Sequence, residues 1–124
     1  AEIKGSVFIN KRFTGSNNER TAADYLESRG VKILEMNFRC RMGEIDIVCK
    51  DGDYLVFAEV KFRSSASYGY PSEAVNFEKI KKICKVSDYY RLIHKIGEDR
   101  KIRYDVISIK GENIEWIKNA FDYI

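Results

Sequence analysis

The chain has 124 residues, of which 44 % are hydrophobic and 33 % are charged, and its formal net charge is +3 at pH 7. This length predicts one compact domain over residues 1–124, and the apolar fraction excludes an intrinsically disordered chain. So small a net charge permits a nucleic-acid partner without arguing for one. For residues 1–9, three interpretations stay open: an arm, a short edge strand, or a cloning remnant.

The first predicted element is a helix within residues 14–30. Ser16 followed by Glu19 fits a capping box, and Gly30 fits a helix stop. The side chains at helical spacing on one face are those of Glu19, Ala22, Ala23 and Leu26.

Five strands and a second long helix follow this first helix. A strand, a helix and a further strand indicate a crossover, and therefore a mixed sheet in an α/β fold. Asp51-Gly52 predicts a two-residue hairpin turn between the second and third strands. In chain order, the elements are predicted at residues 31–39, 43–49, 53–62, about 72–95 (the helix), 102–109 and 114–118.

Cysteine and hydrophobic patterning exclude several classes of protein. The cysteines Cys40, Cys49 and Cys84 are odd in number and widely spaced, and the single histidine is His94. This pattern argues against both a zinc site and a disulfide framework. Free thiols are typical of a reducing compartment, so we expect a cytoplasmic protein. No apolar run approaches about 18 residues, so no membrane span or membrane partner is predicted.

Charged residues interrupt the apolar stretch GEIDIVCKDGDYLVFAEVKFR, residues 43–63. With Asp51-Gly52 as a two-residue turn, Asp46 would face Phe57 and Glu44 would face Glu59. One face of this hairpin, which includes Ile45 and Ile47, is then nearly all apolar, and the charged residues gather on the other. By this alternation, the second face carries Glu44, Asp46, Leu55, Phe57, Glu59 and Lys61.

The charged face can hold a metal ion. Asp46 and Glu59 would be diagonal neighbours, about 7–8 Å apart by backbone, and Mg²⁺ favours such oxygen ligands. Lys61, beside that cation, could steady a developing charge or hold an attacking water. The alternative is a cross-strand ion pair on a solvated face, which Leu55 and Phe57 on the same face make less favourable.

Each predicted helix contributes one further charged residue. Glu19 heads the apolar face of the first helix, where it is either a site residue or a plain capping-box residue. Lys79 lies on the apolar stripe of the second helix, where it either faces the site or extends to solvent. Glu44 is either a further ligand or the partner of Arg41 or Arg63.

The sequence resembles a known family. Asp46, a gap, and then Glu59-Val60-Lys61 resemble the core of the PD-(D/E)XK nuclease motif. The wider pattern resembles the YraN family, a set of bacterial proteins similar to Holliday junction resolvases. One departure is Asn18, where that family often has glycine. The matching segments, from Asn10 to Phe121, are NKRFTG, AADYLESRGVKILEMNFRCRMGEIDIV, VFAEVKFRSS, YGYPSEAV, RYDVISI and KNAF.

The resemblance implies a restriction-endonuclease-like αβββαβ core with a mixed central sheet flanked by helices. It implies Mg²⁺ or Mn²⁺ held by Asp46, Glu59 and the backbone carbonyl of Val60. It also implies a catalytic set that consists of Glu19, Asp46, Glu59, Lys61 and Lys79.

Basic residues suggest where nucleic acid would bind. Arginine suits phosphate, and the candidates near the charged end of the hairpin are Arg39, Arg41 and Arg63. On the second helix we interpret the lysines mainly as a solvating face, with contact to a DNA backbone as the second interpretation. These lysines are Lys81, Lys82 and Lys85.

Two further features receive simpler interpretations. The segment 64–72 is predicted to be a loop whose Tyr68 and Tyr70 either stack on unpaired bases or cover the core. Asp105 is interpreted as structural.

Two hypotheses about function follow. The first is a Mg²⁺- or Mn²⁺-dependent DNA endonuclease that acts on branched or otherwise structured DNA, with DNA favoured over RNA. The second is a nucleic-acid-binding module that keeps the nuclease fold without cutting and works with a partner enzyme. A homodimer is compatible with the first, because symmetric resolvases usually need two active sites. A protein-interaction domain with no nucleic-acid role is a third, weaker alternative.

Overall fold

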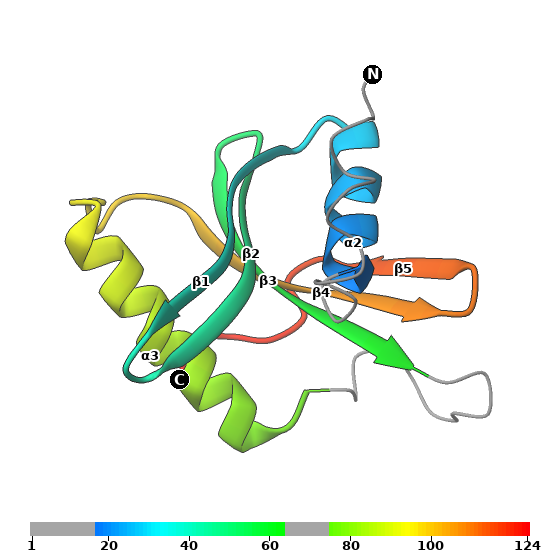
Figure 1. The fold of residues 1–124 in the computed structure, drawn as a ribbon. Helices are drawn as coiled ribbons and strands as arrows, with labels where there is room; N and C mark the ends of the chain where they lie inside the picture. Colours follow the sequence, from blue (N-terminus) through cyan, green and yellow to red (C-terminus); the bar gives the residue numbers. More distant parts are fainter. Residues whose placement is uncertain (1–16, 64–74) are drawn as a thin grey trace.

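A computed structural model describes residues 17–63 and 75–124, which form a five-stranded sheet with a helix on either side (Figure 1). The segments 1–9 and 64–72 and the predicted cap Ser16 lie outside the described residues. The elements are α2 (Asn17–Ser28), β1 (Lys32–Cys40), β2 (Gly43–Asp51), β3 (Tyr54–Arg63), α3 (Phe77–Ile93), β4 (Ile102–Lys110) and β5 (Asn113–Ile117).

The sheet is mixed, with the strand order β1-β2-β3-β4-β5. β3 and β4 run parallel because α3 carries the chain back between them, whereas every other neighbouring pair is antiparallel. The predicted α/β fold with a mixed sheet is therefore confirmed, and it is consistent with a restriction-endonuclease-like core.

The two helices cover opposite faces of the sheet. Ala22, Ala23 and Leu26 of α2 are fully buried against one face, which confirms the predicted apolar stripe. On the other face, α3 packs over Leu55 and Phe57 of β3. The alternative of a solvated face therefore does not hold at these two residues, because they lie beneath a helix. The charged residues lie near strand ends, beyond this cover.

α3 begins at Phe77, later than predicted. The side chain of Asn76 accepts a hydrogen bond from the backbone N–H of Lys79 at 2.9 Å and so caps the helix. The helix ends at Ile93, and the ring of the next residue, His94, lies 4.1 Å from that of Tyr90.

The register of the β2–β3 hairpin differs from the predicted one by two residues. Asp51 pairs with Tyr54, so the turn is Gly52-Asp53, and Gly52 has φ of +61°, which glycine adopts without strain. Ile47 consequently pairs with Ala58. Continuing this register by one position places Asp46 opposite Glu59, closer than the predicted diagonal.

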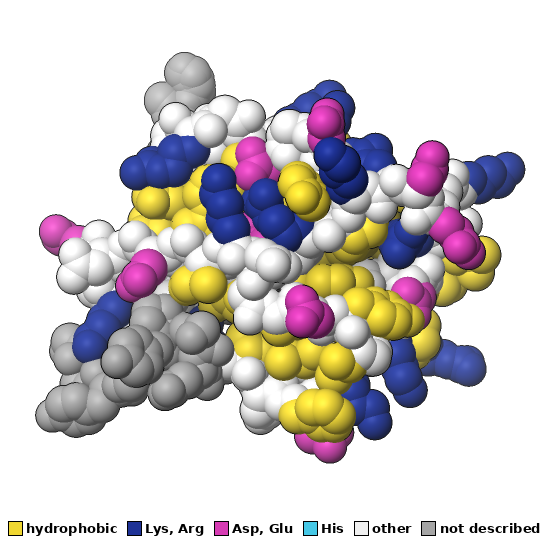
Figure 2. Space-filling model, turned by 180° about the vertical axis from the view of Figure 1, so that it is seen from behind, with side chains coloured by type: hydrophobic (Ala, Val, Ile, Leu, Met, Phe, Trp, Pro, Cys, Tyr) yellow, Lys and Arg dark blue, Asp and Glu magenta, His cyan; other side chains and the backbone are white. Residues whose placement is uncertain are grey.

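Seen from behind, the surface carries Lys and Arg side chains interspersed with Asp and Glu side chains, beside a broad hydrophobic area (Figure 2). Neither of the described helices is long and apolar enough to cross a bilayer.

Candidate functional site

The site lies where β2 and β3 separate. Their last paired residues are Ile47 and Ala58, although both strands continue beyond this pair. The Oδ2 atom of Asp46 accepts a hydrogen bond of 2.8 Å from the backbone N–H of Val60. A side-chain carboxylate therefore satisfies an N–H group of β3 beyond the last paired residues.

Ile45 shows how β2 changes direction at this point. It was predicted to share a face with Ile47, but it packs in the cluster beneath α3, whereas Ile47 packs beneath α2. Strict alternation of side chains therefore fails across Asp46. Sequence alone could not reveal this break, because both residues are equally apolar.

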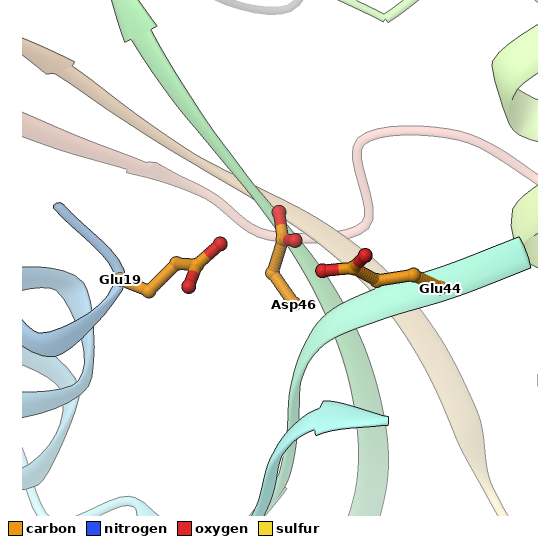
Figure 3. Close-up of side chains that lie close together, drawn as sticks. All are labelled: Glu19, Glu44 and Asp46. Atoms are coloured by element: carbon orange, nitrogen blue, oxygen red, sulfur yellow. The ribbon is translucent and has the colours of Figure 1, made fainter. Parts of the chain in front are cut away.

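Three carboxylates converge at the separation point (Figure 3). Glu19 comes from α2, and Glu44 and Asp46 come from β2. One carboxylate oxygen of each lies within 4.8 Å of the others, and Asp46 lies between the other two in Figure 3. Glu44, an open question in the sequence, thus belongs to the cluster.

Glu59 and Lys79 extend the cluster on the β3 side. The Nζ atom of Lys79 lies 3.3 Å from Oε2 of Glu59, so this lysine of α3 faces the site. Only 8 % of Glu59 is exposed. Burial, and next the charge of Asp46, raise the pKa of Glu59 to about 7, against the lowering effect of Lys79.

Burial also raises the pKa of the carboxyl groups of Asp46 and Glu19. For Asp46, the hydrogen bond from Val60 opposes this rise, whereas for Glu19 the charge of Asp46 adds to it. The site therefore holds acidic groups that repel one another and lack full compensation. Such an arrangement is more typical of a functional site than of a structural one.

Asn37 is a site residue that was not predicted from the sequence. This residue of β1 has φ of +53°, and its polar side chain lowers the pKa of the Glu19 carboxyl against the effect of burial. Asparagine is uncommon inside strands but tolerates positive φ. An asparagine within the strand-forming stretch KILEMNFR was the available signal.

The remaining predicted residues lie around the cluster rather than in it. Lys61 is exposed and forms no ion pair within the described residues. Arg39 is exposed and pairs with Glu44, with 3.3 Å between Nε and Oε1. Arg41 is exposed in the turn between β1 and β2, and Arg63 ends β3, beside Lys110 of β4.

Comparison with known proteins identifies the family. The model of uncharacterised protein family UPF0102 matches residues 18–109. The chain belongs to the UPF0102 family. A UPF0102 protein of Lachnoclostridium phytofermentans is 44 % identical over 114 residues, covering 92 % of this chain and 97 % of the relative. One of Persephonella marina is 44 % identical, with coverage of 87 % and 92 %. One of Thermodesulfovibrio yellowstonii is 46 % identical, with coverage of 86 % and 94 %.

The chemistry of the cluster in this UPF0102 protein suits a hard cation. Its three convergent residues offer carboxylate oxygens and no nitrogen or sulfur ligand. Mg²⁺ and Mn²⁺ favour such oxygen donors, whereas zinc sites are usually built from Cys and His. All three residues lie inside the segment that the family model matches. The residues present therefore fit the metal that the resemblance implies.

Proposed function

We propose that this protein is a Mg²⁺- or Mn²⁺-dependent DNA endonuclease of the PD-(D/E)XK superfamily, related to the YraN proteins. The observation that carries the proposal is the convergence of Glu19, Glu44 and Asp46, from two elements, at the point where β2 and β3 separate. The position of Glu59 in the next strand supports it, because a buried Asp and a buried Glu meet there as the nuclease motif requires.

Each residue has a defined task in this proposal. Asp46, Glu59 and the carbonyl of Val60 hold the metal, with Glu19 and Glu44 as further acidic ligands. The N–H group of Val60 fixes the orientation of the Asp46 carboxylate. Lys79 opposes the rise in the pKa of Glu59 and so favours the ionised form of this carboxyl group. Lys61, which is free to turn toward substrate, orients the attacking water or stabilises the charge that develops on the phosphate.

When bound, the metal supplies polarisation of the phosphodiester and a lower pKa for the attacking water. Pure structural roles explain the cluster less well. A carboxylate buried without full compensation costs free energy, so a chain that keeps several together gains something other than stability.

A cleavage assay tests the proposal. The purified chain is incubated with labelled single-stranded, duplex, flapped and four-way-junction DNA in EDTA, Mg²⁺ or Mn²⁺. We expect metal-dependent cutting, strongest on branched DNA, and a loss of at least about a hundredfold in Asp46→Asn. The matched control is Asp53→Asn, which makes the same chemical change in the exposed β2–β3 turn and should cut like the wild type.

Two outcomes would contradict the proposal. Cutting at the wild-type rate by Asp46→Asn would show that the active site is not at Asp46. Binding of DNA without cutting of any substrate would favour the non-cleaving module that works with a partner enzyme.

A further inference from the structure

The turn between β1 and β2 lies against the middle of α3 (Figure 1). A Cβ atom at Gly43, just after this turn, would lie 3.4 Å from Cγ2 of Val86. The ring of Phe38, near the end of β1, lies 5.1 Å from that of Tyr90. Arg41, between these two contacts in the chain, is therefore held beside α3.

Lysines approach this turn along α3. Lys79, Lys82 and Val86 follow one another at steps of three and four residues, so they lie on the same side of the helix. Lys79 touches Glu59 of the carboxylate cluster, and Val86 touches the turn. Lys82 therefore lies between the cluster and Arg41, and Lys85 lies on the adjacent outward side.

We define Arg41, Lys82 and Lys85 as the basic edge. All three are exposed, and none forms an ion pair within residues 17–63 and 75–124. Glu78 lies one helical turn before Lys82 without pairing with it, and Asp88 instead accepts a hydrogen bond from the hydroxyl of Tyr123 at 2.7 Å. The basic edge is thus a row of cations whose charge no neighbouring acid neutralises.

We infer that the basic edge binds the sugar-phosphate backbone of double-helical DNA and leads one duplex arm of the substrate toward the carboxylate cluster. This inference rests on the proposed function and adds the path of the substrate. Exposed, unpaired cations on rigid elements complement a row of phosphates and bind them independently of sequence.

A duplex fits this surface better than a single strand. Proteins that bind single strands stack bases on aromatic side chains. The helix between Lys79 and Lys85 carries no aromatic residue. The exposed aromatic residues of α3 lie outside this stretch: Phe77 is the first residue of the helix, with Nζ of Lys81 5.7 Å from its ring centroid, and the ring of Tyr89 lies 6.2 Å from that of Phe38. Phosphate contact, rather than base stacking, is what the basic edge offers.

The test is a salt titration of DNA binding in EDTA, where no cutting occurs. The double variant Lys82→Gln/Lys85→Gln is compared with Lys32→Gln/Lys50→Gln, which removes two exposed cations that pair across β1 and β2 at the other end of these strands. Fluorescence anisotropy with duplex and single-stranded probes reports Kd. Two lost phosphate contacts should reduce the slope of log Kd against log salt for duplex by about 1.8 and weaken binding several-fold.

The expected result is this change in the first variant alone, with the thermal shift caused by Mn²⁺ preserved in both variants. An unchanged slope in Lys82→Gln/Lys85→Gln, an equal change in the control, or an effect confined to single strands would overturn the inference. These outcomes are separable from failure of the proposed function. An unchanged slope together with metal-dependent cutting would overturn this inference but not the proposed endonuclease activity. The expected slope without any cutting would support DNA binding by the basic edge and contradict the proposed activity.

Discussion

The two ends of β2 both carry buried charge, but they compensate it in opposite ways. At Asp51, the last residue of the strand, direct hydrogen bonds from cations and neutral donors satisfy the acidic groups. At Asp46, near the first residue, acidic groups outnumber the cations that touch them. The same strand therefore joins a structural charge network to a site that is prepared for a ligand.

The network at the Asp51 end is nearly complete. Arg103 donates hydrogen bonds to both carboxylate oxygens of Asp105 at 2.9 Å and to Asp51 at 2.8 Å. Asp105 also accepts from the indole N–H of Trp116 and from the backbone N–H of Asn119. Asp105 is fully buried and accepts four hydrogen bonds, as its structural interpretation required.

The cations of the cluster end are looser. The side chain of Arg103 is 11 % exposed, whereas that of Lys79 is 48 % exposed and that of Arg39 is 71 % exposed. Each of these two exposed cations touches one acidic residue at 3.3 Å, and Glu19 and Asp46 have no ion pair within the described residues. A metal ion bound at this end would supply the positive charge that the neighbouring side chains do not provide.

The same substitution at the two aspartates sharpens this comparison, and Asp105→Asn should have the largest effect. The amide keeps the shape but loses the charge that Arg103 requires, and its NH₂ group faces existing donors. We expect the free energy of unfolding to fall by about 3 kcal/mol, measured by urea denaturation. The exposed Asp53→Asn is the control, and a loss below about 0.5 kcal/mol would contradict the structural role of the network.

Asp46→Asn should behave in the opposite way. Without metal, removing a repelled charge should leave stability unchanged or raise it by about 1 kcal/mol, because the amide oxygen can still accept from Val60. With Mn²⁺ at a hundred times its Kd, the wild type should gain about 2.7 kcal/mol and the variant almost nothing. Thermal unfolding with and without Mn²⁺ measures both effects, and an equal gain in the two proteins would move the metal away from Asp46.

The pH dependence of stability gives a third test. Because the pKa of Glu59 is raised from 4.5 to about 7, the folded state binds more protons than the unfolded state between these values. Stability of the metal-free protein should therefore fall as pH rises from about 4.5 to about 7. Glu59→Gln should remove this component, on the order of 3 kcal/mol at pH 8, and should change stability little at pH 4. Denaturant unfolding across this pH range measures it, and a parallel fall in both proteins would assign the pH dependence elsewhere.

The sequence predicted the fold well, because long elements carry strong periodic signals. The helical stripe of Ala22, Ala23 and Leu26 located α2 to within a few residues. The Asp-Gly turn signal located the β2–β3 hairpin equally well. The sequence also placed Glu19, Asp46, Glu59 and Lys79 in one site, where the structure brings them together. Their catalytic roles stay predictions.

The errors have local causes. The turn is Gly52-Asp53 rather than Asp51-Gly52, and a choice of one residue in a turn moves the register by two positions, which leaves each side chain on the same face. Leu55 and Phe57 lie on the face where they were predicted, but nothing in these two residues indicates that a helix covers them. Asn37 was missed because its role depends on the proximity of β1 to α2, and no local pattern in either segment indicates that proximity.

Asn37 provides the smallest predicted effect and the finest test of the site. Two properties are combined at this residue, the positive φ that its backbone adopts and the effect of its side-chain amide, which lowers the pKa of Glu19. Asn37→Gly retains the first and removes the second, whereas Asn37→Ala loses both and should cost about 1 kcal/mol more in stability. Comparing the two variants therefore separates backbone strain from the orientation of Glu19.

If Asn37 positions Glu19 for a cation, the glycine variant should fold normally and yet bind Mn²⁺ more weakly, by up to about tenfold. The loss should be greater at low pH, because without the Asn37 amide the pKa of Glu19 rises further and a protonated carboxyl binds cations poorly. Calorimetric titration of Mn²⁺ at two pH values measures this difference. Unchanged affinity in Asn37→Gly would mean that the asparagine serves the bend of β1 alone, and that Glu19 is oriented by α2 without help.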